Sequence, residues 1–221
     1  MGSTDLAGRL DLAVLAPGTH RDQVRSACRE ARELGCAAVC VAPVWVGEAA
    51  KMLQGSSVSV AAVIGFPLGA STTLSKVVEA LECIKQGASE LDIVIHVGAA
   101  LSGDYKAVRN EAREIVKRTP EVLHKFILEM GLLPEATLKR TVKAVAAADP
   151  AFLKTGTGTT GPGITVAAVQ QLRQMAPASI RLKASGGIRT RQQAEALVAA
   201  GADRLGTSRA GELLGSGGES H

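Results

Sequence analysis

The strongest constraint on the fold is a regular alternation of two kinds of segment along the chain. Short apolar, β-branched runs alternate with amphipathic stretches rich in Ala, Glu and Arg, which predict strands and helices respectively. The expected strands are 10–15, 37–42, 58–65, 90–97, 124–130, 151–156, 180–185 and 203–207. The expected helices are about 21–34, 43–54, 72–86, 105–118, 134–147, 164–175, 190–199 and 209–214.

Strict alternation of strand and helix predicts an α/β fold with a parallel sheet whose faces are covered. Eight such units predict a closed (β/α)8 TIM barrel in a single domain. An open doubly wound sheet is the second choice, and it is disfavoured because the turn after the first expected strand carries no GxGxxG fingerprint. We expect the barrel to span residues 1–214 and residues 215–221, GSGGESH, to form a flexible tail.

Composition narrows the possible partners. The net charge of +4 is spread along the chain and aromatic residues make up only 2 %, so a nucleic-acid partner is not expected, whereas a small anionic substrate fits. The cysteines at 28, 36, 40 and 83 have neither a CxxC motif nor zinc spacing, and the four histidines show no paired spacing. We therefore expect reduced thiols, no metal, no membrane segment and a cytoplasmic protein.

Two lysines lie inside apolar, strand-like runs and precede glycine-rich sequence: Lys154 in FLKTGTG and Lys183 in RLKASGG. An ammonium ion is costly to bury in such a run, and a neutral amine costs less. A second cation nearby lowers a lysine pKa further, which makes the amine nucleophilic at neutral pH. Either lysine alone could extend its charge to the surface. The pair on consecutive strands favours a Schiff-base enzyme.

Barrel active sites lie at the C-terminal ends of the strands, so Asp92, Glu129, Lys154 and Lys183 are expected to converge there. Asp92 lies among Ile and Val and needs a cationic or hydrogen-bonding partner. A structural salt bridge is one interpretation, and the two lysines favour proton transfer instead. His96 shares the face of Asp92 by period two. It is either bonded to a neighbouring loop, which we favour, or an auxiliary acid–base group.

Several blocks occur in an order that resembles one enzyme family. They are VIGFPLGA at 63–70, LDIVI at 91–95, FLKT at 152–155, KASGGIRT at 183–190 and GADRLGTS at 201–208. Together they resemble deoxyribose-phosphate aldolase, and the resemblance extends from about Asp11 to Leu214. It implies a class I, metal-free and cofactor-free aldolase on a TIM barrel. Such an enzyme cleaves 2-deoxy-D-ribose 5-phosphate to D-glyceraldehyde 3-phosphate and acetaldehyde.

The resemblance also implies roles for single residues. Lys154 matches the Schiff-base lysine, Lys183 the lysine that lowers its pKa, and Asp92 the carboxylate that shuttles protons. The residues expected at the substrate and its phosphate are Asp11, Thr157, Gly186, Gly187, Arg189, Gly206, Ser208 and Arg209. Glycine-rich loops after the last two strands could instead be ordinary turns, but their position favours phosphate binding. The implied partners are phosphorylated sugars and aldehydes, and a second copy in a homodimer.

The sequence departs from the family pattern near the expected substrate site. Ala13 replaces a threonine that helps to hold a substrate hydroxyl, and Ala42 replaces a usual Asn or Tyr. Cys40 matches a position close to the substrate, and the chain ends in His221 rather than in the tyrosine of some members. Two alternatives to the family reaction therefore stay open: a related Schiff-base aldolase with a different acceptor aldehyde, and a non-catalytic sugar-phosphate-binding paralogue.

Overall fold

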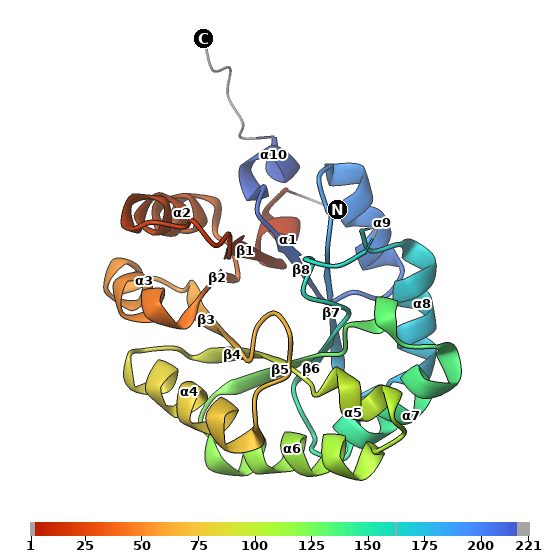
Figure 1. Ribbon diagram of the computed structural model, residues 1–221. Helices are drawn as coiled ribbons and strands as arrows, with labels where there is room; N and C mark the ends of the chain where they lie inside the picture. Colours follow the sequence, from red (N-terminus) through yellow and green to blue (C-terminus); the bar gives the residue numbers. More distant parts are fainter. Residues whose placement is uncertain (1–2, 162, 216–221) are drawn as a thin grey trace.

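Eight parallel strands close into a barrel in sequence order, from β1 next to β2 around to β8 next to β1 (Figure 1). The computed structural model describes residues 3–161 and 163–215. The strands are β1 Leu10–Val14, β2 Ala38–Val41, β3 Ser59–Ile64, β4 Glu90–Val94, β5 Leu123–Ile127, β6 Phe152–Lys154, β7 Arg181–Ser185 and β8 Arg204–Thr207. The predicted (β/α)8 barrel is confirmed, with one strand overlapping each of the eight expected ranges.

Helices surround the barrel on the outside (Figure 1). The helices that follow the eight strands are α2 Arg21–Leu34, α3 Val46–Leu53, α4 Thr73–Lys85, α6 Tyr105–Arg118, α7 Glu135–Ala146, α8 Val166–Met175, α9 Arg191–Ala199 and α10 Ala210–Leu214. Four short elements were not expected as separate units: α1 Ser3–Ala7, α5 Val97–Leu101 and the 3₁₀ turns η1 Pro43–Trp45 and η2 Met130–Leu132. In the described part of the chain, no helix combines the length and apolarity needed to cross a membrane.

Two strands, β4 and β5, end three residues earlier than their apolar runs predict. The run 90–97 continues past the end of β4 at Val94 because α5 starts directly after it and also buries apolar side chains. His96 begins that helix: its Nδ1 accepts the N–H of Ala99 at 3.0 Å. The run 124–130 continues past the end of β5 at Ile127, where Glu129 takes a left-handed backbone conformation (φ 49°) before η2. Apolar character alone therefore misplaces both strand ends.

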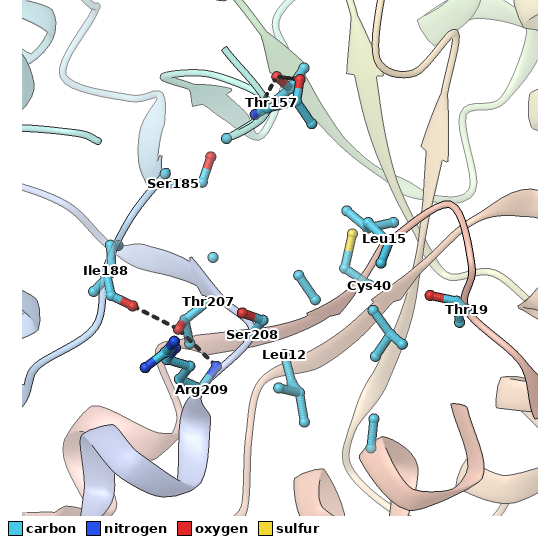
Figure 2. A pocket seen from close by; sticks show the side chains of 18 of the residues that line it. Leu12, Leu15, Thr19, Cys40, Thr157, Ser185, Ile188, Thr207, Ser208 and Arg209 are labelled. Atoms are coloured by element: carbon cyan, nitrogen blue, oxygen red, sulfur yellow. Dashed lines mark hydrogen bonds between the residues drawn. The ribbon is translucent and has the colours of Figure 1, made fainter. Parts of the chain in front are cut away.

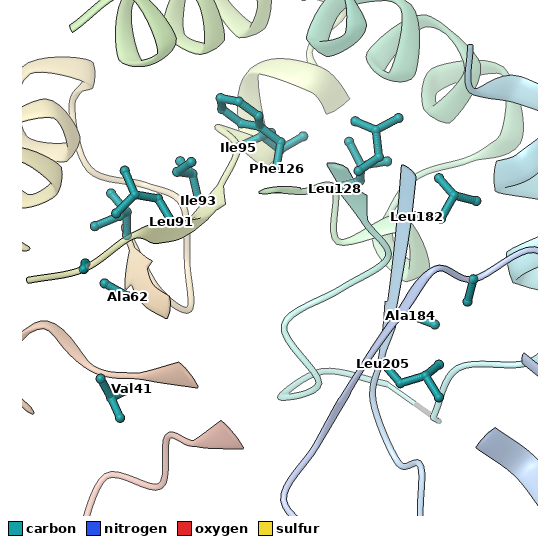
Figure 3. Packing of buried hydrophobic residues seen from close by; sticks show 14 of the residues in the cluster. Val41, Ala62, Leu91, Ile93, Ile95, Phe126, Leu128, Leu182, Ala184 and Leu205 are labelled. Atoms are coloured by element: carbon teal, nitrogen blue, oxygen red, sulfur yellow. The ribbon is translucent and has the colours of Figure 1, made fainter. Parts of the chain in front are cut away.

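The outward faces of the strands form the main hydrophobic core against the helices, and Figure 3 shows Val41, Leu91, Phe126 and Leu205 among them. A smaller apolar cluster inside the barrel contains Ala38, Cys40, Ala61 and Val63, from β2 and β3. The interior also holds a group of charged residues. Its members, called here the charged cluster, are Asp11, Glu90, Asp92, Lys125, Lys154, Lys183 and Arg204. The barrel interior thus has an apolar side and an ionic side.

The four cysteines are unpaired and buried, as expected for reduced thiols. Gly215 ends α10 in the left-handed conformation (φ 75°). The remainder of the expected flexible tail, 216–221, lies outside the described residues.

Candidate active site

Asp92 joins the two predicted catalytic lysines. Lys154 Nζ and Lys183 Nζ each donate to Asp92 Oδ2 at 2.7 Å, and the three residues come from β6, β7 and β4. The register pairs Lys154 with Lys183 on neighbouring strands, so both side chains enter the barrel side by side. The exposed fractions are only 3 % for Lys154, 1 % for Lys183 and 0 % for Asp92. The structure thus brings together three of the four residues that were expected to converge.

The other members of the charged cluster form ion pairs with these three residues and with one another. Asp11 on β1 accepts from Lys183 Nζ and from the Arg204 guanidinium, and it lies 3.5 Å from Lys125 Nζ. Lys125 on β5 donates to Asp92 Oδ1 at 2.9 Å and pairs with Glu90. When Lys154 is neutral, the three carboxylates of the cluster balance its three remaining cations. A neutral Lys154 is therefore the state in which this buried group carries no net charge.

The two lysines have opposite pKa shifts. Burial lowers the pKa of Lys154, and the charge of Lys183 lowers it further, against the opposing pull of Asp92. Burial also acts against a charged Lys183, but the carboxylates of Asp11 and Asp92 outweigh it and raise the pKa of Lys183. Burial acts against a charged Asp92 too, yet the lysines hold its pKa well below the usual range, with Lys125 the strongest. An amine with a lowered pKa thus lies beside a lysine with a raised pKa, an arrangement that favours a nucleophile next to an ammonium ion.

Both lysines open into a cavity of about 710 Å³ at the C-terminal ends of the strands. One wall is apolar and includes Cys40, which belongs to the inner apolar cluster, and Ala13, Leu15 and Phe66, which pack against that cluster. Figure 2 shows Leu15 and Cys40 on this wall, across the cavity from Ser185, Ile188, Thr207 and Arg209. The opposite wall consists of the loops after β6, β7 and β8.

These loops and the end of β8 contain most of the residues expected at the substrate and its phosphate: Thr157, Gly186, Gly187, Arg189, Gly206, Ser208 and Arg209 all line the cavity. Gly187 has φ 68°, and a Cβ there would lie 3.1 Å from the Gly163 backbone, so the turn requires glycine. Within the described ranges, the N–H groups of Gly187 and Ser208 donate to no protein acceptor. Free N–H groups and two arginines make this wall suited to an anion.

Thr207 fixes the geometry of this wall. Its Oγ1 donates to Ile188 O at 3.0 Å and accepts from Arg209 N at 3.1 Å, the two dashed bonds at its side chain in Figure 2. Gly206 lies deeper: a Cβ there would approach Lys183 Cε at 3.3 Å. The missing side chain of Gly206 thus leaves room for Lys183.

The structure places Glu129, Asp11 and Ala42 differently from their expected surroundings, and it places His96 and Ala13 where they were expected. Glu129 does not join the lysines, because its left-handed backbone turns the carboxylate toward Thr157. Asp11, expected at the substrate, is fully buried among cations and does not line the cavity. His96 caps α5, which supports the interpretation as a locally bonded residue. Ala13 borders the cavity, whereas Ala42 does not.

Lys125 was missed, although it carries the same signal as Lys154, a lysine inside an expected strand. Lys125 is followed by apolar residues and glutamate, whereas Lys154 is followed by glycine-rich sequence. This difference separates the supporting cation from the lysine at the cavity.

Fold and site together define a (β/α)8-barrel enzyme with a buried lysine pair at the catalytic end. Residues 9–215 match the DeoC/LacD family of aldolases, and the chain belongs to this family. It is 44 % identical over 210 residues to the deoxyribose-phosphate aldolase of Trichormus variabilis, covering 95 % of this chain and 92 % of that protein. The enzyme of Thermosynechococcus vestitus is also 44 % identical, with 95 % and 96 % covered. The tetrameric deoxyribose phosphate aldolase from Aeropyrum pernix superimposes with a TM-score of 0.91 at 36 % identity, covering 97 % of this chain and 92 % of that one.

Proposed function

We propose that the protein is a class I aldolase that reversibly cleaves 2-deoxy-D-ribose 5-phosphate to D-glyceraldehyde 3-phosphate and acetaldehyde. The observation that carries the proposal is Lys154, buried at the cavity floor with a lowered pKa and hydrogen-bonded to Asp92 beside Lys183. The relatives named deoxyribose-phosphate aldolase support the choice of substrate. A non-catalytic binding protein would have no need for two lysines that repel each other.

Lys154 starts the proposed reaction. Its neutral Nζ attacks C1 of the open-chain sugar, and loss of water gives a protonated imine. The C3 hydroxyl then loses its proton, the C2–C3 bond breaks, and its electron pair moves to form the enamine. Glyceraldehyde 3-phosphate leaves with C3 as its aldehyde carbon. Protonation of the enamine at C2 and addition of water release acetaldehyde and the free amine.

Asp92 and Lys183 set the charges for these steps. Asp92 Oδ2 accepts from both Nζ atoms, so protons can move between the two lysines through one carboxylate. As the imine becomes a cation, the same carboxylate stabilises it. Lys183 remains charged and lowers the pKa of unreacted Lys154, which favours its neutral form.

The phosphate is proposed to bind at the opposite wall. The N–H groups of Gly187 and Ser208 would hold its oxygens, with Arg189 and Arg209 at the rim. This arrangement leaves the reacting carbons over Lys154. It fits a small phosphorylated sugar, which we propose as the substrate class.

Borohydride trapping tests the proposal. Incubation with acetaldehyde or deoxyribose 5-phosphate and reductant should produce one adduct, which peptide mass mapping locates at Lys154. Lys154→Ala should abolish it. An adduct that persists on another lysine contradicts the assignment.

The apolar wall favours a second candidate, a related aldolase with a different acceptor aldehyde. Ala13 lines the cavity and offers no hydroxyl to the substrate. A site that bonds a hydroxyl discriminates against analogues lacking it, and an apolar wall does so less. Ala13→Thr should raise kcat/KM for deoxyribose 5-phosphate more than for a substrate without the 3-hydroxyl. Equal responses would remove Ala13 from this role.

We further propose a single domain of residues 1–214 that works in the cytoplasm as a homodimer. The eight closed strands support one domain, and the four unpaired cysteines support a reducing compartment. Sedimentation equilibrium across a concentration series tests the dimer, with a monomer at all concentrations contradicting it.

A further inference from the structure

Glu129 is a buried carboxylate in an unfavourable backbone conformation outside the charged cluster. Its exposed fraction is 6 %, and its φ of 49° is one of two positive values at non-glycine residues in the described ranges. Across residues 3–161 and 163–215, no Lys, Arg or His forms an ion pair with it. Neither burial nor backbone strain is favourable for an unpaired carboxylate, so its bonds must offset the cost.

Those bonds all reach one loop. Both carboxylate oxygens of Glu129 accept Thr157 N–H at 3.3 Å, and Oε2 accepts the Thr157 hydroxyl at 2.5 Å. A Cβ on Gly156 would lie 2.7 Å from Glu129 Oε1, so glycine at this position permits the approach. From the other side, Ser185 Oγ donates to Gly156 O at 2.5 Å. The loop that follows Lys154 is thus held between the segment after β5 and the end of β7.

The direction of these bonds determines what Thr157 can offer a ligand. A carboxylate only accepts, so the Thr157 hydroxyl proton is committed to Glu129. The Thr157 oxygen in turn accepts Thr159 N–H at 3.1 Å and the Thr159 hydroxyl at 2.8 Å. Both hydroxyl protons are therefore used inside the loop. Gly158 N–H lies between these residues at the cavity wall, and no described protein atom accepts it.

We propose that Glu129 is a positioning residue for the phosphate end, which orders residues 155–159 so that Gly158 N–H meets a phosphate oxygen. The inference rests on the proposed function for the identity of the substrate. It assigns Thr157 a structural part in the phosphate site rather than a direct hydroxyl contact. The carboxylate contributes through geometry, since its own charge opposes an anion.

The test compares Glu129→Ala and Glu129→Gln with wild type in two assays. Calorimetry with inorganic phosphate measures the anion site alone. Kinetics with deoxyribose 5-phosphate and with unphosphorylated deoxyribose separate phosphate recognition from chemistry. The matched control is Glu111→Gln, which removes another buried carboxylate, one that pairs with Lys76 outside the barrel.

We expect Glu129→Ala to weaken phosphate binding and raise the KM for deoxyribose 5-phosphate by about tenfold or more, because the loop loses every bond to the carboxylate. Glu129→Gln retains one acceptor oxygen, so its phosphate affinity and its KM should lie between those of wild type and Glu129→Ala. The kcat and KM for unphosphorylated deoxyribose should stay near wild type, and Glu111→Gln should leave phosphate affinity unchanged. The proposal is overturned if the phosphate affinity is the same in wild type and Glu129→Ala, or unmeasurable in both. It is also overturned if Glu129→Ala loses kcat/KM equally on the two sugars. Wild type that cleaves neither sugar contradicts the proposed function instead, and the calorimetry still decides the role of Glu129.

Discussion

Lys183 influences the pKa of Lys154 in two ways: through its positive charge, and through Asp92, which accepts a hydrogen bond from both lysines. Its ammonium adds to burial in lowering the pKa of Lys154. In Lys183→Leu that contribution disappears, and Asp92 is left freer to stabilise a charged Lys154. The pKa of Lys154 should rise, so the acidic limb of the kcat/KM profile should move to higher pH by about one unit or more. Lys183→Arg keeps a charge and serves as control, and an unmoved limb in Lys183→Leu contradicts this role.

Cys40 is the one thiol at the cavity wall, among the described residues. Burial raises its pKa to about 11, and its Sγ lies 3.9 Å from Asp92 Oδ2. At neutral pH the thiol is therefore protonated and reacts slowly with enal products of acetaldehyde. We expect gradual inactivation during prolonged exposure, about tenfold faster per pH unit between 7 and 9. Cys40→Ser should be protected. Identical inactivation rates in the two proteins would exclude Cys40 as the target.

At the scale of elements, the loop after β7 should decide phosphate affinity. A valine at position 187 would have to adopt φ 68°, and its Cβ would lie 3.1 Å from the Gly163 backbone. Gly187→Val should raise the KM for deoxyribose 5-phosphate by about tenfold or more and leave acetaldehyde trapping at Lys154 nearly unchanged. Gly103→Val is the control, because Gly103 has φ 78° but nothing within 4 Å of a Cβ. Equal losses in both assays would indicate misfolding.

Elements and single residues differ in how far the sequence predicts them. Lys154, Lys183 and Asp92 could be found because each interrupts an apolar strand. The pairing of Asp11 with Lys183 spans 172 positions and depends on β8 closing against β1, which no local pattern encodes. Likewise, α5 was hidden because its buried face continues the apolar run of β4. The position of Glu129 follows from a backbone conformation that its side chain does not signal.

For the whole molecule, the charged cluster connects β1 with β4 through β8, and its charge state should govern stability at acid pH. Cationic neighbours outweigh burial and lower the pKa of Asp11 and of Asp92. A carboxylate with a lowered pKa stabilises the fold above its unfolded pKa of about 3.9, and this contribution is lost as pH falls toward the folded value. Protonation would also leave buried cations uncompensated.

We therefore expect the free energy of unfolding, measured by urea titration, to be nearly constant from pH 7 to 5 and to fall steeply below about pH 4. Asp11→Asn should cost about 3 kcal/mol at pH 7, because Lys183 and Arg204 lose a buried partner. It should also flatten the acid decline, since the variant no longer has this proton to take up. Glu33→Gln, at an exposed position on α2, should change stability by less than about 0.5 kcal/mol. An acid decline as steep in Asp11→Asn as in wild type would show that other groups control it.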